Sequence, residues 1–149
     1  MSESNAIAIL IELAEKHSDR QARALGQALR QESSESTRLA MLENYRSSYL
    51  RSLAECQQRG LSPALLCNFH EFLARLDTAI GQQRVAVEDA QRTSETARTQ
   101  LTDAEKKRKS LVHIADKRAV VRRRVEDRKE QKEQDEFATR ARWREHEIT

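Results

Sequence analysis

A break of three residues separates two long stretches that contain almost nothing able to end a helix. The chain has 149 residues with only one proline and three glycines, and Gly60, Leu61 and Ser62 form the break. Glycine commonly ends a helix because it reaches the left-handed conformation without steric penalty. Ser62 followed by Pro63 indicates a helix start, since serine caps free amides and proline suits the first helical position. Together the two signals predict an all-α fold in which two long helices form an antiparallel coiled-coil hairpin.

Both stretches repeat apolar residues at the heptad positions a and d, which pack in the seam of a coiled coil. The first stretch, about 4–59, has apolar seam residues at Ile7, Ile11, Ala14, Leu25, Ala28, Leu39, Leu42, Tyr49, Leu53 and Cys56. Its register is interrupted by Ser18, Gln21, Glu32, Glu35 and Arg46. The second stretch, about 63–144, is cleaner, with Leu66, Phe69, Leu73, Leu76, Ile80, Val87, Ala90, Ala97, Leu101, Ala104 and Leu111.

The unequal lengths of the two stretches predict an overhang. If the turn is residues 60–62, residues whose numbers add to roughly 119 face each other in an antiparallel pair. Residues of the second stretch beyond about Lys117 then have no residue of the first stretch to pair with. We therefore expect a single hairpin domain over residues 1–149, with the second helix longer and projecting.

Composition restricts the class of protein. Aromatic residues make up 4% and charged residues 34%, which suits a narrow seam better than a thick core. No run of 18 apolar residues is present, so we expect no membrane span, and the N-terminal residues do not resemble a signal peptide. We expect a cytosolic protein in which Cys56 and Cys67 are small buried thiols and not a disulfide.

Catalytic signals are missing from the sequence. The four histidines are widely spaced, and His70-Glu71 lacks the second histidine of an HExxH zinc site. No glycine-rich phosphate loop is present, and a thin hairpin offers no deep cleft. We expect no enzyme activity, no metal and no cofactor.

An apolar patch near the turn is the first candidate contact site. Its members are spaced to share one side of each helix, and they are Leu42, Tyr45, Tyr49, Phe72, Leu76 and Ala79. Tyr45, Phe72 and Ala79 fall at g, a position that flanks the same edge of the seam in both helices. The patch is either a partner site or a widened seam.

A basic run on the projecting helix is the second candidate. Between residues 106 and 128 lie ten Lys or Arg and three Asp or Glu, and the run of interest is Lys117, Arg118, Arg122, Arg123, Arg124 and Arg128. It could dock into an acidic protein surface or pore, bind phosphates of nucleic acid or membrane, or be a solvated helix. No aromatic residues interleave with it, which argues against nucleic acid. Beyond it, Phe137 and Trp143 are either partner anchors or chance exposed aromatics.

An ordered set of residues resembles the FliJ family of flagellar export proteins over nearly the whole chain. The set is Leu13-Ala14-Glu15-Lys16, Leu25-Gly26, Met41-Leu42, Tyr45, Tyr49, Gly60, Phe72, Leu76, Ala79-Ile80, Gln131-Lys132, Asp135-Glu136-Phe137-Ala138 and Arg140. The resemblance implies a cytosolic stalk and adaptor of the flagellar type III export apparatus, peripheral at the inner membrane. Such a protein would insert into the hexameric export ATPase, contact the membrane export gate and escort export chaperones.

The resemblance also assigns the apolar patch to export-gate binding, at Leu42, Tyr45, Tyr49, Phe72, Leu76 and Ala79. Two flanking residues, Arg38 and Gln83, depart from the enteric pattern, which bears on partner specificity. Three alternatives stay open: the equivalent stalk of a virulence type III secretion system, a basic coiled coil that binds nucleic acid, and a coiled-coil homodimer.

Overall fold

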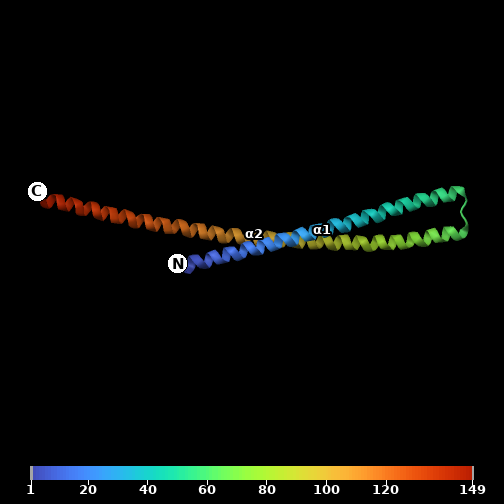
Figure 1. The fold of residues 1–149 in the computed structure, drawn as a ribbon, viewed down its shortest axis with the longest axis horizontal. Helices are drawn as coiled ribbons and strands as arrows, with labels where there is room; N and C mark the ends of the chain where they lie inside the picture. The colour runs from blue at the N-terminus through green and yellow to red at the C-terminus, as the bar shows by residue number, and fades with distance from the viewer. Residues whose placement is uncertain (1, 149) are drawn as a thin grey trace. The chain divides into compact units, whose positions relative to one another are not determined.

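The computed structural model describes residues 2–148, and these form two helices joined by a short turn (Figure 1). Helix α1 is Ser2–Arg59, with 58 residues, and α2 is Pro63–Ile148, with 86 residues. No strand occurs within residues 2–148, and the all-α prediction is confirmed. The sequence predicts a start near residue 4 and an end near residue 144. The helices extend further at both ends because neither terminal segment contains glycine or proline.

The turn is stabilised by local capping. Gly60 has a φ of 92°, the left-handed conformation in which glycine is favoured, and its amide donates to the Gln57 carbonyl at 3.3 Å. The Ser62 hydroxyl accepts from the Leu65 amide at 3.3 Å, and the Ser62 carbonyl accepts from the Leu66 amide at 3.1 Å. Ser62 therefore acts as the N-cap of α2.

By its contacts the described chain divides into two units. Residues 17–104 form the first, and residues 2–16 together with 105–148 form the second. In the first unit the two helices run antiparallel from the turn (Figure 1). Glu35 contacts Gln83 and Tyr49 contacts Phe69, and in both pairs the residue numbers add to 118, close to the 119 expected. A single domain over the whole chain stays a prediction.

The core of residues 17–104 is a narrow heptad seam. Its buried apolar side chains all lie at predicted seam positions, and they are Ala28, Leu53, Leu73, Leu76, Ile80, Val87, Ala90, Ala97 and Ala104. None of the described side chains is less than 2% exposed, because two helices cannot surround a residue on all sides. Cys56 is half-buried and Cys67 is exposed, and both are free thiols. The prediction that both thiols are buried is wrong for Cys67, which follows the seam residue Leu66 and faces outward.

The second unit contains a short seam followed by an exposed helix. Ile7 and Ile11 are half-buried and Ala14 is buried, and Leu111, Val112 and Ala115 of α2 are half-buried. Every described side chain after Ala115 is exposed, up to Ile148. Neither helix, within residues 2–148, contains a segment long and apolar enough to cross a bilayer.

Two candidate contact surfaces

Four aromatic rings form a connected cluster close to the turn. Tyr45 and Tyr49 are one helical turn apart on α1, with ring centroids 6.5 Å apart. The Phe72 ring lies 4.5 Å from the Tyr49 ring and meets Tyr45 edge-on at 6.0 Å, while Phe69 lies 4.9 Å from Tyr49. Such tilted and edge-to-face contacts stabilise by about 0.5–1.5 kcal/mol beyond area burial. The cluster therefore holds the four rings against one another.

The six residues of the predicted apolar patch are buried to different depths. Leu76 is 6% exposed and lies in the seam, so it supports the patch from beneath. Leu42, Tyr49, Phe72 and Ala79 are half-buried. Tyr45 is 53% exposed and is the most exposed of the six residues. The structure thus brings the predicted patch together, but only five of its members reach the surface.

The opposite edge of the same seam is covered by ion pairs. Arg46 Nε lies 2.6 Å from Asp77 Oδ1, and Arg84 lies 3.4 Å from Glu43 Oε1. Both pairs join α1 to α2. Their charges are mostly solvated, so each contributes at most about 1 kcal/mol. Their effect is geometric, because they cover one edge while the aromatic edge stays open.

A polar layer crosses the seam next to the patch, and sequence reasoning identified it only as an interruption. Glu35 is 8% exposed, and its Oε2 and backbone carbonyl both accept from Gln83 Nε2, at 2.5 and 2.9 Å. Gln31 Nε2 donates to Glu35 Oε1 at 2.8 Å, and Arg38 lies 3.6 Å from the same oxygen. The heptad register places Gln83 at a seam position opposite Glu35, so the sequence does contain the information that the two residues pair. The layer fixes which α2 residue faces which α1 residue.

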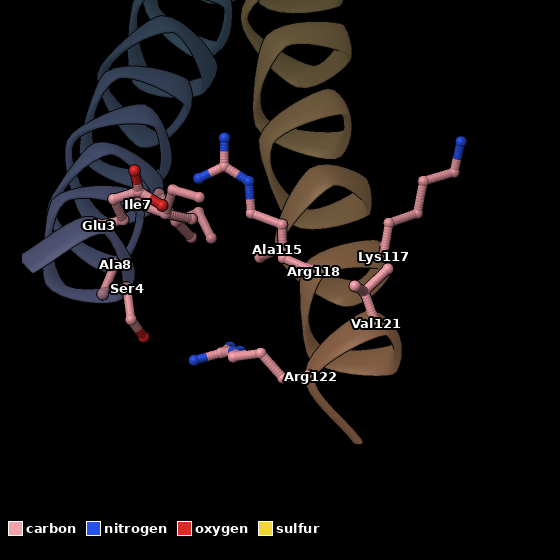
Figure 2. Close-up of a pocket in the computed structure, with 10 residues that line it drawn as sticks. Glu3, Ser4, Ile7, Ala8, Ala115, Lys117, Arg118, Val121 and Arg122 are labelled. Carbon is pink, nitrogen blue, oxygen red and sulfur yellow. The ribbon is translucent and has the colours of Figure 1, made fainter. Parts of the chain in front are cut away.

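A cleft of about 610 Å³ lies in the second unit, between residues 3–11 and 115–122 (Figure 2). Its walls are apolar at Ile7, Ile11 and Ala115. Of the predicted basic surface, Lys117, Arg118 and Arg122 line it, and Arg118 and Arg122 point toward α1 in Figure 2. The cleft combines apolar walls with basic residues on α2 and the acidic Glu3 on α1.

The six basic residues do not form one stripe. Residues in a helix are about 100° apart around its axis. Lys117, Arg124 and Arg128 therefore share one face, Arg118 and Arg122 share a second, and Arg123 lies on a third. All six are exposed. The basic surface surrounds the α2 segment.

The structure assigns no function to the other candidate residues. Phe137 and Trp143 are among the most exposed large apolar side chains, and their role as partner anchors stays a prediction. Within residues 2–148, no three His, Cys, Asp or Glu side chains gather closely enough to hold a metal ion.

Comparison with known proteins identifies similar chains. The family model described as "Flagellar FliJ protein" matches residues 4–147. The chain is 28% identical over 141 residues to the flagellar FliJ protein of Escherichia coli K12, covering 95% of this chain and 96% of that protein. The flagellar FliJ protein of Salmonella typhi matches with the same identity and coverage. No solved structure gives a significant match.

Proposed function

The chain belongs to the FliJ family of flagellar proteins, and from this membership we propose that it is a non-enzymatic stalk and adaptor of the flagellar type III export apparatus. It binds the hexameric export ATPase through the basic surface of α2, from Lys117 to Arg128. It contacts the membrane export gate through the aromatic patch, and it escorts export chaperones. It acts at the cytoplasmic face of the inner membrane.

The main support for gate binding is that the two edges of the seam differ. One edge is covered by two interhelical ion pairs, and the other presents Tyr45 and Phe72 on a preformed aromatic cluster. Apolar groups left open beside a closed seam tend to be contact sites. Tyrosine and other aromatics also contribute disproportionately to binding energy because they bury much area at little entropic cost.

The distribution of positive charge supports docking to the ATPase. A helix that lies along an axis of a ring meets its partner on all sides, so its charges should face several directions. Lys117, Arg118 and Arg123 lie on three different faces of α2. A pore lined by carboxylates would attract this segment on the sides that α1 leaves open.

The ATPase assignment is tested by the activity of the cognate hexamer with and without this protein. We expect stimulation that Arg118→Glu with Arg122→Glu reduces at least tenfold in apparent affinity. Arg140→Glu with Arg142→Glu, which makes the same charge change in the tail, is the control and should stimulate as the wild type does. Equal loss in both variants would mean that only net charge matters, and no stimulation by the wild type would refute the assignment.

The gate assignment is tested by capture of the cytoplasmic part of the export gate protein. We expect Tyr45→Ala with Phe72→Ala to abolish capture while the helical circular dichroism signal is preserved. Leu29→Ala with Val85→Ala removes apolar side chains exposed elsewhere on the same unit and should leave capture intact. Wild-type capture by the Tyr45 and Phe72 variant would remove the patch from the function.

A further inference from the structure

The open edge of the seam continues beyond the aromatic patch in both directions. On α2, the g positions Leu65, Phe72, Ala79 and Ala86 follow at intervals of seven residues. Leu65 is 51% exposed and the other three are half-buried. The stripe from Leu65 to Ala86 is about 30 Å long, at 1.5 Å per residue. It is much longer than a contact made only by Tyr45 and Phe72.

Helix α1 adds to the same edge. Met41 lies one turn before Tyr45 and is 65% exposed. A flexible thioether adapts to irregular apolar partners. The small side chains of Ala79 and Ala86 let another backbone come close, while Phe72 and Leu65 provide bulk. Seven-residue spacing, with the bulky residues toward the turn and the small ones away from it, is a pattern that a further helix can follow in a coiled coil.

Between Leu65 and Ala86 the charged residues of this edge are basic, whereas the next c positions beyond it, Glu55 and Asp89, are acidic. The positions that share it are 38, 41, 45, 48 and 52 in α1 and 65, 68, 72, 75, 79, 82 and 86 in α2, and none of them is Asp or Glu. Arg38 and Arg75 are both exposed there. Arg38 is 3.6 Å from Glu35, and Arg75 has no ion pair among the described residues. A partner with carboxylates beside its apolar stripe would complement the edge.

We propose that this edge binds one amphipathic helix of about 20 residues, with acidic side chains flanking its apolar face. The bound helix packs along α2 as a third strand of the coiled coil, that is, as its third helix. Leu65, Met41 and Ala86 extend the contact beyond the aromatic patch, and Arg75 selects acidic partners. The identity of the protein that supplies the helix, the export gate, rests on the proposed function. The length, helical form and charge of the bound segment rest on the edge itself.

The test uses overlapping 25-residue peptides covering the cytoplasmic part of the export gate protein, titrated into the full chain. We expect one acidic peptide to bind and to gain helical circular dichroism signal. Ala86→Glu and Leu65→Ala should each weaken binding at least fivefold. Arg75→Glu should weaken it at least tenfold at low salt and less at 0.5 M salt, where screening removes the charge term.

Matched controls separate this proposal from general damage. Val85→Glu places the same charge one residue away on an outward face, and Leu50→Ala removes a leucine from the ion-paired edge. Both should bind the peptide as the wild type does. Absence of a peptide that gains helix, or wild-type binding by the Ala86, Leu65 and Arg75 variants, overturns the third-strand proposal even if Tyr45 and Phe72 are required.

Two further outcomes have distinct meanings. Wild-type binding of the whole gate protein after Tyr45→Ala with Phe72→Ala would refute the proposed function and not only its extension. Sedimentation showing a dimer that Ala86→Glu dissociates would identify the occupant as a second copy of this chain, and the proposal of a gate helix would then be wrong.

Discussion

Glycine favours the fold at residue 60 and disfavours it at residue 26. Gly60 has a φ of 92°, and an added Cβ would meet no atom within 4 Å, so any cost there is backbone strain alone. Gly26 lies inside α1, where an added Cβ would meet only the Arg30 guanidinium at 3.7 Å. That contact is at ordinary van der Waals distance and with the end of a flexible side chain.

We predict opposite effects of alanine at these two sites. Gly60→Ala should lower the free energy of unfolding by about 1 kcal/mol, because a Cβ disfavours the left-handed conformation. Gly26→Ala should raise it by about 0.5–1 kcal/mol, because glycine is a poor helix former. Urea denaturation followed by circular dichroism measures both, and a stabilising Gly60→Ala would contradict the C-cap assignment.

Glu35 and Gln83 form the second residue-scale feature, since a buried carboxylate and an amide satisfy each other across the seam. Gln83→Leu should cost about 1–3 kcal/mol because it leaves the buried Glu35 oxygen without that donor. Glu35→Leu combined with Gln83→Leu should recover that loss or exceed wild-type stability, since an apolar layer replaces the pair. Additive losses in the double variant, measured by the same denaturation, would show that the pair does not interact.

At the scale of elements, α2 has two parts with different sources of stability. Residues 63–115 contribute side chains to a seam, whereas every described side chain after Ala115 is exposed. The exposed part depends on helix propensity and on neighbouring side chains along the helix. Local opening should therefore begin in this part of α2.

We predict that deleting residues 123–148 leaves the thermal midpoint of the remaining chain within about 2 °C of the full-length value, since no seam contact is lost. The helical signal should fall in proportion to the residues removed. Deleting residues 2–16 serves as the comparison, because it uncovers Leu111 and Ala115 and should lower the midpoint of the second unit. A large drop in the midpoint on removing 123–148 would reveal seam contacts made by the tail.

At the scale of the whole molecule, the chain pairs with itself through a turn of three residues. The left-handed Gly60 and the capping bonds of Ser62 form where the backbone reverses direction. A pair of chains joined side by side would straighten this turn and lose these bonds. The contacts of residues 17–104 are thus those of one chain folded back.

We therefore predict a monomer of 17.2 kDa in sedimentation equilibrium at micromolar concentrations. A mass near twice that value, independent of dilution, would favour the homodimer alternative.

Local sequence determined the helices, the break at residues 60–62 and the seam positions of both helices. Helical periodicity and capping act over a few residues, so Gly60, Ser62 and the heptad leucines are enough to specify them. The aromatic patch was also predictable, because Tyr45 and Tyr49 share a face of one helix and Phe72 has the matching position on the other.

Only the tertiary structure decided how side chains from the two helices meet. Gln83 accommodates Glu35 across 48 positions of chain, ion pairs cover one edge of the seam, and Leu76 is buried beneath the patch while Tyr45 is exposed. These outcomes depend on side-chain conformations of residues distant in the chain, which periodicity does not encode. The sequence therefore specified the two helices and their register, and packing between them decided which edge of the seam is left for a partner.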